Sequence, residues 1–152
     1  CDLELINIRS MKKKKMSYRY LEHSTDAIIE VIAPNLTKAF EIVGKSVVQT
    51  ILDDSKIEEI NQKKIIVKGK DLHYLLYNWL EEIIILTITD GFAIKRFELD
   101  VKKEPFVITA ELFGEDIDIK KHGFKVEIKS PTFHEMEINE GIDVKMKYLL
   151  DL

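Results

Sequence analysis

The sequence predicts a mixed α/β fold, an α+β two-layer sandwich in which two helices cover one face of a largely antiparallel sheet. Segments with the period-two alternation of strands recur along the chain, and they are interrupted by only two segments with helical periodicity. The predicted order is strand-strand-helix-strand-helix, followed by about five strands. No linker-like stretch divides this order, so we expect a single domain over residues 16–152.

The first strands and the first helix are predicted by alternation and capping. Tyr18–Leu21 alternates and is rich in aromatic residues, and Ala27–Ile32 is a second strand that Pro34 stops. Asn35 occupies the position of an N-cap. The helix that follows has apolar residues at steps of three and four: Leu36, Ala39, Phe40, Val43, Val47 and Ile51. Gly44 lies inside this helix, so we expect close packing against a neighbour there.

A third strand over about Lys63–Lys68 is broken by Gly69, and Asp71 is placed to cap the second helix. The apolar stripe of that helix consists of Leu72, Leu75, Leu76, Trp79, Leu80 and Ile83. Trp79 has two interpretations, a core residue or a platform for a ligand, and its place in the stripe favours the core.

The pattern of residues 92–150 predicts mainly strands. Phe92–Lys102 and Phe106–Leu112 alternate around the turn at 103–105 and predict a hairpin. After a polar loop over 114–123, three short strands are expected over Phe124–Lys129, Phe133–Ile138 and Val144–Leu150.

Composition excludes several classes of protein. The chain has 152 residues and is 45% hydrophobic, which excludes intrinsic disorder for the domain. Its longest apolar run, Ile83 to Leu86, is far shorter than the roughly 20 residues of a membrane helix. A single Cys excludes an internal disulfide framework and a Cys-based zinc site, and we therefore expect a cytoplasmic protein.

The charge is unevenly distributed. Residues 1–15 hold five Lys or Arg and two acidic residues, whereas the rest of the chain carries a net charge of −7. The Lys12–Lys15 run is either a nucleic-acid tail or, more simply, part of a disordered N-terminal extension over residues 1–15. Because an acidic body does not hold phosphate backbones well, we expect no strong direct binding of nucleic acid and a protein as the partner.

No catalytic template is matched. The six glycines are scattered rather than gathered into a phosphate-binding loop, and no nucleophile elbow or paired-histidine motif is present. The sequence therefore specifies no enzyme.

Three polar features remain, each with a structural alternative. Residues 20–26 form a polar cluster between two strands, which turn chemistry would also explain. Lys129 and His134 flank a break at Pro131, which is also typical of an edge strand with a bulge. Finally, an apolar strand runs directly into Asp151-Leu152, where a terminus would usually fray; an ordered end would give the last carboxylate a fixed place.

Taken together, these features resemble the archease family over essentially all of residues 16–152. The resemblance is carried by four motifs in order: Tyr18-Arg19-Tyr20-Leu21-Glu22-His23-Ser24-Thr25-Asp26, Leu75-Leu76-Tyr77-Asn78-Trp79-Leu80, Lys129-Ser130-Pro131-Thr132-Phe133-His134, and the terminal Asp151-Leu152. The chain departs from the family pattern at Ser24-Thr25, at Ile28 and at Ser130-Pro131. These departures spare Asp26, Lys129 and Asp151.

The resemblance implies a fold, a function and a partner. The fold would be an α/β sandwich of strand-helix-strand-strand modules. The protein would be an accessory factor, not an enzyme, that activates the RtcB-type RNA ligase of tRNA splicing. It would promote guanylylation of the ligase histidine, sustain multiple turnover and broaden the use of nucleotides in tRNA splicing and RNA repair. Two alternatives stay open, a small-molecule-binding sensor domain and a chaperone-like adaptor for RNA-modifying enzymes.

The resemblance also implies a site. Asp26, Asp151 and Leu152 would bind a metal, Leu152 through its backbone or terminal oxygens. Because this set offers only oxygen and is anionic, it suits a hard cation, Ca²⁺ first, with Mg²⁺ or Mn²⁺ as alternatives. Lys129 would act in activation of the partner, and His23 and His134 would have a structural or orienting role.

Overall fold

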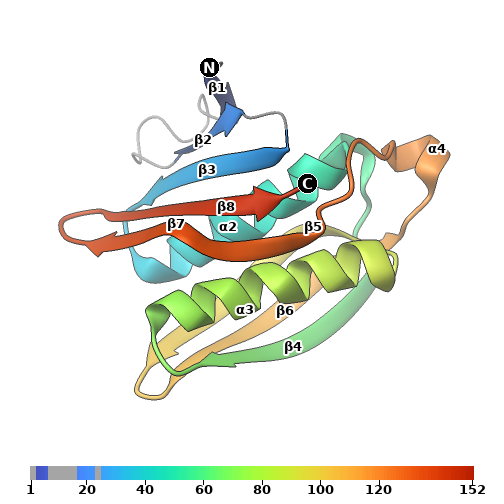
Figure 1. Ribbon diagram of the computed structural model, residues 1–152. Coiled ribbons are helices and arrows are strands. Elements are labelled where there is room, and N and C mark those ends of the chain that lie inside the picture. Colours follow the sequence, from blue (N-terminus) through green and yellow to red (C-terminus); the bar gives the residue numbers. More distant parts are fainter. Residues whose placement is uncertain (1–2, 7–16, 23–24) are drawn as a thin grey trace.

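Two antiparallel sheets pack against the main helices in the computed structural model, which describes residues 3–6, 17–22 and 25–152 (Figure 1). The first sheet has the order β1-β2-β3-β8-β7 and contains β1 (Leu3–Ile6), β2 (Ser17–Glu22), β3 (Asp26–Ala33), β8 (Val144–Asp151) and β7 (Ser130–Glu140). The second has the order β4-β6-β5 and contains β4 (Asn61–Gly69), β6 (Phe106–Asp116) and β5 (Phe92–Lys103). The helices are α2 (Leu36–Ile51), α3 (Leu72–Ile84) and the short α4 (Ile119–His122).

The predicted mixed class and the antiparallel pairing are confirmed, but the strands divide between two sheets instead of forming one. Helix α2 contacts β3 and β8 of the first sheet and β5 of the second, and α3 contacts β7 of the first and β4 of the second. The two helices are therefore packed against both sheets. Periodicity identifies a strand and its buried face, but it does not identify the partner of that strand, so this division could not be predicted.

Both predicted helix caps are confirmed. The side chain of Asn35 accepts a hydrogen bond from the backbone N–H of Lys38 at 2.9 Å, and Asp71 does the same for Tyr74 at 2.9 Å. The expected close packing at Gly44 is also present, since a Cβ there would lie 2.6 Å from the Phe97 ring. None of the helices that the structure describes is long and apolar enough to cross a membrane.

Trp79 is a core residue. Its side chain is fully buried, and its indole N–H donates a hydrogen bond to the backbone carbonyl of Phe40 at 3.0 Å. Its ring meets that of Phe97 edge-on, with centroids 6.3 Å apart. The core interpretation is thus supported over a ligand platform, because the single polar atom of the indole is already satisfied inside the protein.

One prediction of local structure is wrong, and one remains a prediction. In the N-terminal extension, residues 3–6 form β1, which pairs with β2; residues 1–2 and 7–16 lie outside the described part, so the expected disorder of the extension stays a prediction. The strand expected over Phe124–Lys129 is absent apart from one isolated bridge between Phe124 and Leu52. The backbone of this segment is attached to the end of α2 instead, where the N–H of Lys125 bonds to the Ile51 carbonyl at 2.7 Å.

Candidate functional site: an aspartate pair at one end of the five-stranded sheet

Asp26 and Asp151 lie directly opposite each other, at the start of β3 and the end of β8. The neighbouring pair is hydrogen-bonded, because the N–H of Leu152 donates to the Thr25 carbonyl at 3.0 Å. Asp26 and Asp151 are therefore a non-hydrogen-bonded pair, in which opposed side chains approach most closely, with Cβ atoms about 4.5–5.5 Å apart. Residues 125 positions apart in the sequence thus meet through strand pairing.

The chain end and the β7 strand complete this region. The hydrogen bond from Leu152 to Thr25 holds the last residue beside β3, and the N–H of Lys129 donates to the Asp151 carbonyl at 2.7 Å. Ser130, the next residue, pairs directly with Asp151 on the other side of β8. The structure therefore brings together Asp26, Asp151, Leu152 and Lys129, and it adds Ser130, which no sequence pattern marks as a site residue.

The donors of this region fit a hard cation. Like charges directly opposite each other on paired strands are destabilising, so two opposed carboxylates favour a bound cation between them. The ligand atoms of Asp26, Asp151 and the Leu152 main chain are all oxygens, which suits Ca²⁺ or Mg²⁺. No group of three or more His, Cys, Asp or Glu side chains within the described ranges is placed to hold a metal. The implied set differs from such a group, because only Asp26 and Asp151 contribute side chains and Leu152 contributes main-chain oxygens.

The two histidines are not brought into this pair. His134 lies in a stretch of β7 where the register with β8 shifts, between Thr132 and Glu137. Its side chain is 76% exposed, with Nε2 3.6 Å from a carboxylate oxygen of Glu135. Within the described residues, no hydrogen bond or ion pair connects His134 with either aspartate. His23 lies outside the described residues, so the orienting role of both histidines stays a prediction.

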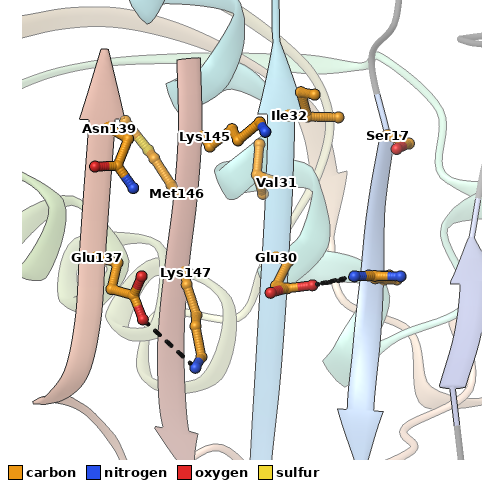
Figure 2. A pocket seen from close by; sticks show the side chains of 10 residues that line it. Ser17, Glu30, Val31, Ile32, Glu137, Asn139, Lys145, Met146 and Lys147 are labelled. Atoms are coloured by element: carbon orange, nitrogen blue, oxygen red, sulfur yellow. Dashed lines mark hydrogen bonds and ion pairs between the residues drawn. The ribbon is translucent and has the colours of Figure 1, made fainter. Parts of the chain in front are cut away.

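The face of the first sheet that carries the aspartates is turned away from the helices. A shallow cavity of about 380 Å³ lies further along this face (Figure 2). Four of its charged side chains form cross-strand pairs, Arg19 with Glu30 at 2.7 Å and Lys147 with Glu137 at 3.6 Å, while Lys145 also lines the cavity. Because these four charges neutralise each other in pairs, we assign them to the stability of the sheet.

A second polar cluster, which the sequence did not reveal, anchors α4. His122 is fully buried, and its Nδ1 accepts a hydrogen bond from the Asp118 N–H at 3.0 Å. Its Nε2 must therefore carry the proton, and it lies 3.1 Å from the Glu115 carboxylate. Hydrogen bonds from Lys121 and from the Glu58 backbone lower the pKa of Glu115 from 4.5 to about 2. The hydrogen bonds of this cluster hold α4 against the end of β6, in the segment that leads to Lys129.

This lowered pKa predicts a specific pH dependence of stability. Since the folded state holds Glu115 ionised down to about pH 2, the unfolded chain takes up the proton first as the pH falls. The stabilisation is complete above about pH 4.5 and is lost between about pH 4.5 and pH 2. Urea unfolding across this range should therefore show a smaller pH dependence for Glu115→Gln than for the unsubstituted protein.

The matched control is Glu127→Gln, which changes an exposed glutamate. Its pH dependence should follow that of the unsubstituted protein. Equal slopes for Glu115→Gln and Glu127→Gln would show that the hydrogen bonds to Glu115 do not stabilise the fold.

Comparisons with known proteins identify the family of this chain. The model of the archease protein family (MTH1598/TM1083) matches residues 18–152. A protein archease of Pyrobaculum islandicum is 36% identical over 143 residues, covering 91% of this chain and 97% of that protein. A protein archease of Pyrococcus abyssi is 32% identical over 125 residues, covering 81% and 88%.

A solved structure also matches. The solution structure of Methanobacterium thermoautotrophicum protein 1598 superposes with a TM-score of 0.73 and 26% identity, covering 89% of this chain and 98% of that one. With a family model that spans residues 18–152 and relatives above 30% identity over most of their length, the chain belongs to the archease family.

Proposed function

We propose that this protein is an accessory activator of an RtcB-type tRNA-splicing RNA ligase and is not itself an enzyme. In this role it promotes guanylylation of the ligase histidine, sustains multiple turnover and broadens the choice of nucleotide. Membership of the archease family supports the proposal. The observation that carries it is the meeting of Asp26, Asp151 and Lys129, from three separate parts of the sequence, at one end of the sheet.

In this proposal, Asp26, Asp151 and Leu152 hold a divalent cation, Ca²⁺ by preference. The cation offsets the charge of the carboxylates and supplies a fixed positive centre at the end of the sheet. The exposed Lys129 extends from the backbone next to Asp151, where a flexible ammonium group can meet a carboxylate of the ligase or a nucleotide phosphate.

The geometry also limits how a partner can approach. The other face of β3 and β8 is covered by α2. A protein that contacts the aspartate pair must therefore arrive from the side opposite α2 or at the end of the sheet. A net charge of −7 on residues 16–152 favours a positively charged protein surface over an RNA backbone as the direct contact.

The test is multiple-turnover ligation. A cognate ligase is combined with GTP, Mn²⁺ or Mg²⁺, and a substoichiometric amount of this protein, and the ligated RNA is measured over time. We expect more product than ligase molecules only when this protein is present. Lys129→Ala should remove the stimulation while leaving the stability to urea unchanged, because the side chain is exposed.

The matched control is Lys145→Ala, which removes an exposed lysine of β8 that has no ion pair within the described residues. This variant should stimulate fully. If neither the unsubstituted protein nor Lys145→Ala increases turnover, the proposed function is wrong.

A further inference from the structure

Ser130 completes a row of three side chains across three neighbouring strands. Asp151 of β8 pairs with Asp26 of β3 on one side and with Ser130 of β7 on the other. Directly paired residues of antiparallel strands point to the same face of the sheet. The Ser130 hydroxyl therefore lies on the side of Asp151 that is opposite Asp26. It makes no hydrogen bond to any part of the chain that the structure describes.

The spacing between the three strands allows side chains of all three to bind one cation. Neighbouring strands lie about 4.8 Å apart, and oxygen ligands lie about 2.3–2.6 Å from Ca²⁺, so a cation above the central Asp151 is within reach of both flanking side chains. Ca²⁺ takes about six to eight oxygens, more than two aspartates and Leu152 supply. A hydroxyl adds an oxygen without adding a further negative charge to a site that already has two opposed carboxylates.

The other hydroxyl on this part of β7 is engaged elsewhere. Thr132 pairs with Leu149, so it lies in the next row away from the aspartates. Its hydroxyl oxygen accepts a hydrogen bond from the N–H of His134 at 3.1 Å. The next row of β3 and β8 is apolar, with Ile28 opposite Leu149, and these side chains are only 6% and 7% exposed. Of these two hydroxyls of β7, that of Ser130 is therefore the one that is free and correctly placed.

We infer that the hydroxyl oxygen of Ser130 is a further ligand of the cation held by Asp26 and Asp151. This inference rests on the cation site of the proposed function. It assigns a direct role to a residue that the family resemblance gave none, and it predicts one coordinated water fewer than the two aspartates and Leu152 alone would leave.

The test uses Tb³⁺, a luminescent substitute for Ca²⁺, bound to the full chain. The decay of its luminescence in H₂O and D₂O counts the water molecules on the ion, and a titration gives its affinity. We expect Ser130→Ala to add about one coordinated water and to weaken binding about tenfold. Ser130→Thr, which keeps the hydroxyl, should keep the water count. Ser17→Ala, on the same face but opposite Ile32, should change neither value.

The outcomes distinguish a failure of the cation site from a failure of the role of Ser130. If the unsubstituted protein binds no Tb³⁺, or if Asp151→Asn binds it equally well, the cation site itself is wrong. If Asp151→Asn abolishes binding but Ser130→Ala keeps both affinity and water count, only the role of Ser130 is wrong. Weaker binding by Ser130→Ala with an unchanged water count would make Ser130 a hydrogen-bond donor to Asp151, which would overturn direct ligation.

Discussion

Replacing Asp151 by Asn should have opposite effects on stability with and without a divalent cation. In Ca²⁺, the variant loses a charged ligand, and its affinity should fall by at least about 100-fold, more than the loss of an outer hydrogen bond typically causes. In EDTA, the same change removes the repulsion between two opposed carboxylates and should stabilise the fold by about 0.2–1 kcal/mol. Urea unfolding in both buffers, together with a calorimetric Ca²⁺ titration, measures both effects.

Asp26→Asn should reproduce both effects, because Asp26 is the other half of the pair. Stimulation of the ligase should be lost in both variants. Asp100→Asn is the matched control, since Asp100 is an exposed residue of β5 in the other sheet. Full Ca²⁺ affinity and full activation in Asp151→Asn would show that this chain does not use the aspartate pair.

Replacing Trp79 by Ala should cost about 3–5 kcal/mol of the free energy of unfolding. The fully buried ring contacts Phe97, and its N–H satisfies the Phe40 carbonyl, so truncation leaves a cavity where α3 meets α2 and the second sheet. Trp79→Phe keeps most of the volume and should cost less, mainly through the lost hydrogen bond. Since Trp79 is the only tryptophan, unfolding must be followed by circular dichroism.

Ile142→Ala provides the control for the core substitution. Its side chain is 98% exposed in the turn between β7 and β8, so its removal should change the stability by less than about 0.5 kcal/mol. A loss below 1 kcal/mol in Trp79→Ala would show that the ring is not packed in the core. Ligand-dependent stabilisation that disappears in Trp79→Phe would instead support the sensor alternative.

Local structure was predicted well where a few neighbouring residues determine it. The caps Asn35 and Asp71 act through backbone groups only three residues away, so a short stretch of sequence contains the whole interaction. The apolar stripes of both helices are buried as predicted, except for their first residues, Leu36 and Leu72, which are half-buried. The composition of Phe124–Lys129 suits a strand, but the backbone of this segment bonds to the distant end of α2, which its composition does not predict.

The candidate site shows the same division between what neighbouring residues determine and what distant contacts determine. The family motifs identified Asp26, Lys129 and Asp151, but the register between β3, β8 and β7 decides that these residues meet and that Ser130 joins them. A shift of one residue in either pairing would turn these side chains to opposite faces of the sheet. The buried contact between His122 and Glu115 likewise joins two strongly polar residues whose burial no pattern of periodicity predicts.

The sequence by itself determined the class of the fold, the two main helices and most strands, and the core position of Trp79, while Asp26 and Asp151 were indicated by the resemblance to the family. Only the tertiary structure decided that the strands form two sheets around the helices and that Ser130 stands beside Asp151. The physical reason is the range of the interactions. Periodicity and capping act within a few residues, whereas strand partners and register depend on contacts between more distant segments, 21 residues apart for Ser130 and Asp151 and 125 for Asp26 and Asp151.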